Sequence, residues 1–437
     1  MIIVQILVLV VLVGVFGALH WYLWRRLVRD TTAEGSAWRR AGTVVVVAGA
    51  VLGLAAVRDD MPGLPFAWES AVDWPGFMWL ALFLYLLLAL AVGEAVRPVL
   101  LRWLVRRDAR LADAMAAASA PKTVARQSEL VSAGVSHPDP AQLPNAAATE
   151  PEAGPSGLAS PALLSRRRFV SRVVGGAAGV VALGTTGYGT YNVLAGPQIK
   201  RLTIPLAKLP RTAHGFRIAV VSDLHLGPIL GRDFSQRVVD TINSTQPDLI
   251  AVVGDLVDGS VTDLASAVEP LADLRARHGS YFVTGNHEYV SGAAQWVEKV
   301  RELGLRPLEN ARTELPGFDL AGVNDVTGER EDHGPDFARA LGDRDRSRTA
   351  VLLAHQPVVI DDAMSYGVDL QLSGHTHGGQ MWPGQLLAGL ANPTVAGLER
   401  YGDTQLYVTR GVGTWGPPVR VGAPSDITIV ELASTQA

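Results

Sequence analysis

Leu249-Ile250-Ala251-Val252-Val253-Gly254-Asp255 is the stretch that decides the fold, because an unbroken apolar run ends there at a glycine and a carboxylate. Such runs are typical of strands that are covered on both faces. Four more β-like runs in the second half of the chain also lead into Asp, Asn or His; they are residues 217–222, 281–284, 350–354 and 368–372. Together the five runs predict an α/β domain.

Helical patterns at residues 234–244 and 293–303 separate these runs and supply the covering helices. Since ligands of open α/β sheets bind beyond the carboxyl ends of strands, we expect the polar residues to share one cleft. The chain has no cysteine, which excludes disulfides, zinc–cysteine sites and thiol catalysis. Carboxylate and amide oxygens mixed with imidazoles favour a pair of divalent metals, and hence metal-assisted hydrolysis of a phosphate ester.

Five motifs carry a family resemblance in their order along the chain. They are Asp223-Leu224-His225, Gly254-Asp255 with Asp258, Gly285-Asn286-His287-Glu288, His355, and Gly374-His375-Thr376-His377. This series resembles the calcineurin-like metallophosphoesterases, over about residues 216–432. The continuation Gly378-Gly379-Gln380 resembles the bacterial membrane-linked phosphodiesterase branch. The resemblance implies a two-sheet β-sandwich flanked by helices.

The same resemblance implies how the metals would be held. A first metal would take Asp223, His225, Asp255 and His377, and Asp255 would bridge to a second metal completed by Asn286, His355 and His375. Two cations roughly 3.5–4 Å apart would clamp the phosphoryl oxygens and activate a water. Oxygen–nitrogen sites of this kind accept Mn, Fe, Zn or Mg.

Other residues of these motifs have expected roles near the metals. His287 follows Asn286, which is expected to bind one metal. We therefore expect His287 to stabilise the transition state or to protonate the leaving oxygen. His287 and the bridging Asp255 are the catalytic candidates. Asp258 is expected to support the ligand loop. Glu288 either orients His287 or caps the following helix. Gln380 is a candidate substrate contact, and Gly378 and Gly379 are expected to let the backbone approach the metals.

The first hundred residues hold three apolar spans, at residues 2–24, 41–57 and about 74–92. The first is long enough at helical rise to cross a bilayer of roughly 30 Å. A soluble buried core is the alternative, but three uncharged spans so close together favour a membrane. We therefore predict a transmembrane region with three helices over residues 1–111, followed by a flexible linker at 112–164, which is rich in Ala, Pro, Ser and Gly.

Residues 165–196 begin with Ser165-Arg166-Arg167-Arg168-Phe169 and continue with a glycine-rich, mildly apolar stretch. The segment resembles a twin-arginine export signal, or it is a fourth transmembrane helix with a basic flank. Both readings deliver the phosphoesterase domain, residues 197–437, to the same side. Val193-Leu194-Ala195 is a possible cleavage site.

Arginines cluster after the first and third spans, whereas the loop after the second span is acidic. Because positive loops stay in the cytoplasm, we expect a multi-pass protein of the cell membrane with an extracytoplasmic catalytic domain. The formal net charge is −4, and residues 197–437 hold 21 Lys and Arg against 29 Asp and Glu. This acidic balance argues against nucleic-acid binding.

The sequence thus favours a membrane-anchored phosphodiesterase acting on a lipid or cell-envelope phosphate ester through metal-activated water. The expected partners are that substrate and the membrane, with export machinery as a possibility. A catalytically silent metal-binding sensor or envelope scaffold is the main alternative. A transporter is disfavoured because the three front spans carry few internal polar groups.

Overall fold

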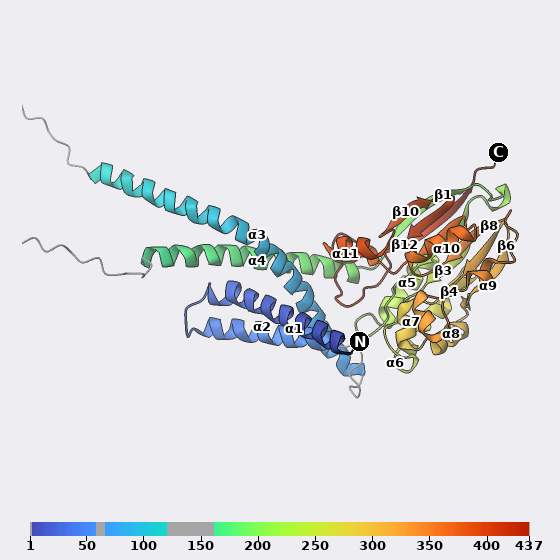
Figure 1. Ribbon diagram of the computed structural model, residues 1–437, viewed down its shortest axis with the longest axis horizontal. Helices are drawn as coiled ribbons and strands as arrows, with labels where there is room; N and C mark the ends of the chain where they lie inside the picture. Colours follow the sequence, from blue (N-terminus) through green and yellow to red (C-terminus); the bar gives the residue numbers. More distant parts are fainter. Residues whose placement is uncertain (1, 58–65, 120–160, 437) are drawn as a thin grey trace, which may run out of the picture.

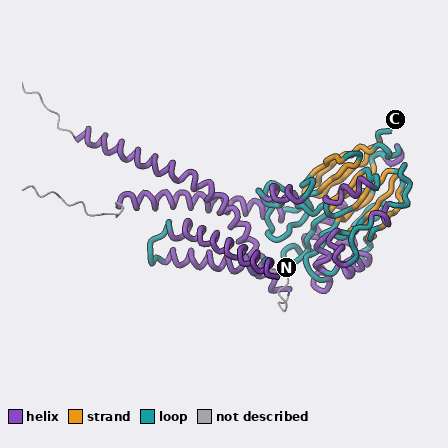
Figure 2. Tube along the Cα trace, in the orientation of Figure 1, coloured by secondary structure: helices purple, strands orange, loops and turns teal. Residues whose placement is uncertain are grey.

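The computed structural model describes residues 2–57, 66–119 and 161–436, which form a bundle of long helices joined to an α/β domain (Figure 1). Among the described residues, strands occur only in that second part, whereas the described part of the bundle is helical apart from its turns (Figure 2). The architecture therefore changes along the chain from long helices to an α/β domain between residues 194 and 198.

Four helices build the bundle. They are α1 (Ile2–Trp24), which continues as the π-helical turn η1 (Arg25–Arg29), α2 (Ala37–Ala56), α3 (Phe66–Ser119) and α4 (Pro161–Leu194). All four are long and apolar enough to cross a membrane. Valine and leucine side chains stay exposed on the bundle surface, as expected where lipid would cover them.

The boundaries differ in part from those predicted. The third helix runs to Ser119, so residues 112–119, which we assigned to the linker, are helical. The rest of that linker to residue 160 lies outside the described residues. Residues 161–194 form one continuous helix, as the fourth-span alternative requires.

The α/β domain contains two six-stranded sheets, which confirms the expected sandwich. In spatial order the first sheet consists of β1 (Gln198–Leu206), β12 (Asp426–Ser434), β2 (Phe216–Val221), β3 (Leu249–Val253), β4 (Ser280–Val283) and β5 (Arg306–Pro307). The second consists of β10 (Gly397–Tyr401), β11 (Thr404–Val408), β9 (Leu370–Ser373), β8 (Thr349–Leu353), β7 (Phe318–Gly322) and β6 (Ala311–Leu315).

Alternating side chains of the central strands serve two different cores. Ile218 and Val220 of β2 point into the core between the sheets, while Ala219 and Val221 point to the core beneath the helices. This follows from the two-residue period of a strand and explains why every position of β3 is buried. The first sheet is covered by α5 (Arg232–Ser244), α6 (Val261–Val268) and α8 (Ala293–Glu302), and the second by α9 (Phe337–Leu341) and α10 (Ile360–Ser365).

Parallel pairing determines where the functional residues meet. The strands β2, β3 and β4 are parallel neighbours in the first sheet, and β8 and β9 are parallel neighbours in the second. Their carboxyl ends therefore open at one edge of the sandwich. Two short helices lie there, α7 (Asn286–Ser291) and α11 (Gly384–Ala391).

The bundle and the domain share buried contacts. Val193, near the end of α4, is fully buried in the core beneath the first sheet, and β1 begins five residues later. In the opposite direction, Val419 of the domain packs with the core of the helix bundle. The α/β domain thus packs directly against the helix bundle.

Candidate metal centre

The predicted ligands occupy the turns that follow β2, β3, β4, β8 and β9. Five of them have left-handed backbone conformations that non-glycine residues rarely adopt; these are Asp223, His225, Asp255, His375 and His377, with φ between 45° and 71°. Such strain clusters at functional sites, where surrounding structure holds the residue in place. The tight turns aim side chains from different strands at one point.

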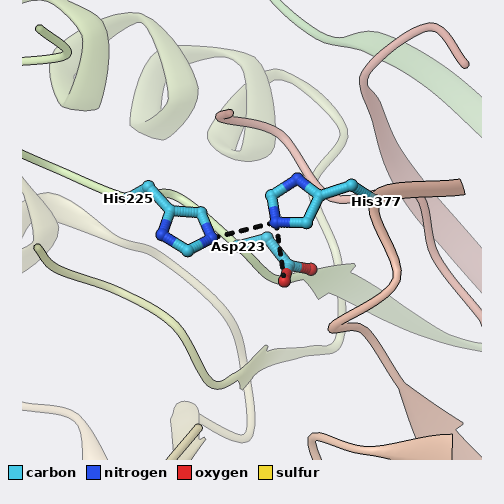
Figure 3. A group of neighbouring side chains, drawn as sticks. All are labelled: Asp223, His225 and His377. Carbon is cyan, nitrogen blue, oxygen red and sulfur yellow. Dashed lines mark hydrogen bonds and ion pairs between the residues drawn. The ribbon is translucent and has the colours of Figure 1, made fainter. Parts of the chain in front are cut away.

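The first cluster consists of Asp223, His225 and His377 (Figure 3). The Nε2 atoms of the two histidines face each other at 2.9 Å, and His377 Nε2 lies 3.5 Å from an Asp223 carboxylate oxygen. All three side chains are buried. A place where two imidazole nitrogens and a carboxylate converge suits a divalent cation.

The second cluster consists of Asp255, His355 and His375, joined by Asn286. His355 Nε2 lies 3.0 Å from Asp255 Oδ2. The side-chain oxygen Oδ1 of Asn286 lies 3.2 Å from His355 Nε2 and 2.9 Å from His375 Nδ1. The Nδ1–H of His355 donates a hydrogen bond to the Val253 carbonyl at 2.8 Å. This bond fixes the tautomer that leaves Nε2 free to bind a metal.

Asp255 connects the two clusters. Its Oδ2 atom lies 3.8 Å from His225 Nε2 of the first cluster and 3.0 Å from His355 Nε2 of the second. All seven predicted ligands therefore converge around one carboxylate. The donors suit divalent cations, with hard oxygens and imidazoles and no thiolate.

His287 lies beside the clusters and is partly exposed to solvent. Its Nδ1 atom lies 2.7 Å from Asp258 Oδ1, and the same oxygen lies 2.8 Å from His225 Nδ1. Asp258 therefore orients a ligand and the catalytic candidate at once, in agreement with its expected supporting role. His287 also belongs to a third possible ligand group, with His225 and Asp255.

Within the described part of the chain no hydrogen bond or ion pair joins Glu288 to the His287 ring, because backbone N–H groups engage its carboxylate. Its buried carboxylate accepts hydrogen bonds from the backbone N–H groups of Asp255 at 3.0 Å, Leu256 at 2.7 Å and Gly285 at 2.6 Å. The last bond caps α7, as the second alternative expects. The other two hold the Asp255 loop against that helix.

Gln380 and Gly379 contact loop and helix residues of the domain. The side-chain amide of Gln380 donates to the carbonyls of Trp415 and Pro417, so it holds a loop in place. A Cβ at Gly379 would lie 2.3 Å from the backbone of Gln385 in α11, and none of its three nearest atoms belongs to a metal ligand. Close approach is required instead at Gly285, where a Cβ would lie 2.3 Å from Asp255 Oδ1.

Sequence reasoning missed Arg420, a fully buried arginine behind the first cluster. Its guanidinium donates to the carbonyls of Gly413, Ala423 and Arg410, and its Nη2 lies 3.1 Å from His377 Nδ1. A guanidinium only donates, so Nδ1 accepts and the proton of the neutral ring lies on Nε2, between the two histidines. A cation bound there would displace that proton. No motif marks Arg420, because most of its partners are backbone carbonyls.

Several ionisable side chains are buried close together in the metal centre, and this shifts their pKa values. Burial raises the pKa of Asp223, and burial with the nearby His355 lowers the pKa of His375 to about 4. Burial opposes protonation of His287, but Asp258 and Asp255 outweigh it and raise its pKa to about 9. The lowered pKa of His375 favours the neutral ring that a metal needs, whereas the raised pKa of His287 favours the protonated ring of a proton donor.

Comparison with known proteins agrees with this geometry. Residues 216–379 match the calcineurin-like phosphoesterase family. A metallophosphoesterase of Bacillus subtilis is 33% identical over 287 residues, which cover 62% of this chain and 99% of that protein. A transmembrane protein with a metallophosphoesterase domain from Danio rerio is 38% identical over 259 residues, 56% of this chain and 59% of the relative. The chain thus spans under two thirds of that relative's length.

Among solved structures, a dimetal phosphatase from Danio rerio aligns with a TM-score of 0.35 and 11% identity, over 49% of this chain and 91% of that one. From its sequence matches, this chain belongs to the calcineurin-like phosphoesterase family. That family uses divalent metals, and this chain carries helices long and apolar enough to cross a membrane.

Proposed function

We propose that this protein is a membrane-anchored phosphodiesterase that uses two divalent cations to hydrolyse a phosphate ester of an extracytoplasmic lipid or cell-envelope molecule. One observation carries the proposal. The metal centre opens into a cleft of about 410 Å³ whose opposite wall is formed by the ends of the helices α2 and α3. A phosphate group in this cleft would lie at the metal ligands and at the membrane helices at the same time.

The two walls of the cleft differ in chemistry. His225, Asp258 and His287 line the side of the metal centre. The bundle contributes apolar groups together with two carboxylates; the residues are Ala55, Ala56, Phe66, Glu69, Val72, Asp73 and Phe77. An amphiphilic ester fits this arrangement, because its phosphate can reach the metals while its apolar part contacts the helix ends. Tethering beside the membrane also raises the local concentration of such a substrate.

The chain's own residues have distinct tasks in the proposed reaction. The seven clustered ligands would hold the cations, with Asp255 shared between them. Two bound divalent cations supply charge stabilisation for the phosphoryl oxygens and lower the pKa of an attacking water. His287, held by Asp258 and partly open to the cleft, is placed to donate a proton to the leaving oxygen.

The distribution of arginines supports the extracytoplasmic side for this reaction. Arg25, Arg26 and Arg29 lie at the turn between α1 and α2, at the end of the hairpin that points away from the α/β domain (Figure 1). The arginines after the third span and those at the start of α4 also lie on the far side from the domain. Positive segments remain in the cytoplasm, so the domain would face outward.

The proposal is tested with the full-length protein in lipid nanodiscs. Hydrolysis of a chromogenic phosphodiester and of a set of phospholipids would be measured with Mn, Fe, Zn or Mg added in turn. Asp255→Ala and His375→Ala should abolish hydrolysis, whereas His333→Ala, at an exposed histidine outside the centre, should not. Full activity in both ligand variants would overturn the catalytic assignment. Metal binding without hydrolysis of any ester would favour the sensor.

A further inference from the structure

A second cleft, of about 550 Å³, lies in the helix bundle at the level of the turn between α1 and α2, away from the metal centre. Four helical segments contribute to its wall: η1, the start of α2, the middle of α3 and the start of α4. Its lining contains only one carboxylate, that of Asp30. Seven arginines line it; they are Arg25, Arg26, Arg29, Arg39, Arg97, Arg167 and Arg168.

Only part of this positive charge is neutralised within the bundle. Arg26 forms ion pairs with Asp30 at 3.2 Å and Glu94 at 2.9 Å. Arg29 shares Asp30 at 3.1 Å, and Arg97 shares Glu94 at 3.6 Å. Two carboxylates therefore serve three of the seven arginines.

Among the residues that the structure describes, the other lining arginines have no acidic partner. Arg39 donates to the backbone carbonyls of Arg29 and Thr32. Within the described part of the chain, Arg25, Arg167 and Arg168 form no ion pair. The Nε atoms of Arg25, Arg26 and Arg97 are buried without a hydrogen-bond acceptor there. Like charges at this density repel one another, so the cleft is set up to receive an anion.

The local backbone gives an independent indication of function. Arg25–Arg29 form a π-helical turn, a rare conformation that is frequently found at functional sites. The turn carries three of the lining arginines. The twin-arginine sequence, which the metal centre does not use, supplies two more from α4. Segments far apart in the sequence thus bring their guanidinium groups to one cavity.

We propose that this cleft, which we call the arginine pocket, binds a phosphate-bearing anion separately from the catalytic site. The guanidinium fork matches phosphate oxygens in paired hydrogen bonds, and basic pockets between membrane helices hold acidic lipid head groups. The phosphate can come from the head group of an anionic lipid at this membrane face or from a soluble phosphate compound. Either source would neutralise the arginines and join all four helices.

The test uses the full-length protein in nanodiscs with the metals chelated, so that the catalytic site does not compete for the anion. Sodium pyrophosphate is titrated calorimetrically in neutral phosphatidylcholine discs. In a second arm, discs containing a minor fraction of phosphatidylglycerol are analysed by native mass spectrometry for retained lipid. Wild-type protein is compared with Arg25→Gln/Arg97→Gln and with the control pair Arg102→Gln/Arg106→Gln, which removes the same charge from α3 outside the pocket.

We expect the pocket pair to lower affinity at least about tenfold and the control pair to leave it nearly unchanged, since each lost charged hydrogen bond is worth about that factor. Lipid retention without pyrophosphate binding would assign the site to a head group, and the reverse to a soluble phosphate. Binding of neither probe by the wild-type protein would overturn the proposal, as would an equal loss in the control pair. The wild-type titrations give this answer even if a variant fails to fold.

Discussion

The Nε2 atoms of His225 and His377 lie 2.9 Å apart, although 152 positions separate the two residues in the chain. His225 follows β2 of the first sheet, and His377 follows β9 of the second. The contact therefore joins the two sheets at the edge where their parallel strands end. It also creates a position that one cation can fill by replacing a proton.

Metal analysis provides the most direct prediction. We expect about two divalent ions per chain after loading, because Asp255 lies between two ligand clusters. His377→Ala removes a donor from the first cluster only and His375→Ala from the second only, so each should lower the metal content and abolish hydrolysis. Elemental analysis of the purified variants measures the stoichiometry. No bound metal in the wild-type protein under any loading condition would contradict the site.

Asp258→Asn tests the orientation of two histidines by one carboxylate. The substitution weakens the contacts of Asp258 with His225 and His287, so we expect kcat/KM to fall roughly 10- to 100-fold while the fold is kept. Asp263→Asn removes a carboxylate that lines the same cleft but contacts neither histidine, and it serves as the matched control. Equal losses of kcat/KM in the two variants would show that the negative charge of the cleft is responsible, and not the contacts of Asp258 with the two histidines.

Arg420→Met should destabilise the domain by about 3 kcal/mol or more. The carbonyls of Gly413, Ala423 and Arg410 would lose their donor, and the bonds to Gly413 and Ala423 are buried. Thermal unfolding followed by circular dichroism measures the loss. The exposed Arg400 is the control, because Arg400→Met should leave the unfolding temperature almost unchanged. A similar shift for both variants would exclude a special role for Arg420.

Ala55→Trp tests whether the substrate enters along the membrane helices. Ala55 lines the cleft on the bundle side, so an indole there would narrow the wall opposite the metal centre. We expect at least about tenfold slower hydrolysis of a phospholipid, with little change for a small chromogenic diester. Leu54→Trp places the same bulk at an exposed neighbouring position of α2. Unchanged phospholipid hydrolysis in Ala55→Trp would argue against this entry route.

Retention of α4 in the mature protein is also expected. Cleavage after Ala195 would take fully buried Val193 from the domain core and separate Gly189 from its contact with Val419. Burying a valine side chain contributes roughly 1.5–3 kcal/mol, so release would weaken the domain. Intact-mass measurement of the membrane fraction should give a product that still contains α4 joined to the domain. A soluble product beginning near Gly196 would contradict this.

The pattern of apolar residues along the chain predicted much of the fold. The apolar runs before Asp223, Asp255 and His355 became buried strands, because covering on both faces leaves no polar alternation. The helices predicted at 234–244 and 293–303 are α5 and α8, with ends that differ by one or two residues. The role of Glu288 was only half predicted, since its two further backbone partners lie more than thirty positions away.

The sequence by itself determined the donor types, their order at strand ends and the apolar length of the helices, because these depend on composition and on contacts along the chain. Tertiary structure alone decided that Arg420 stands behind His377, that the metal centre faces the ends of α2 and α3, and that seven arginines share one pocket. The physical reason is that these relationships join segments far apart in sequence, through backbone carbonyls and packing surfaces that leave no local pattern.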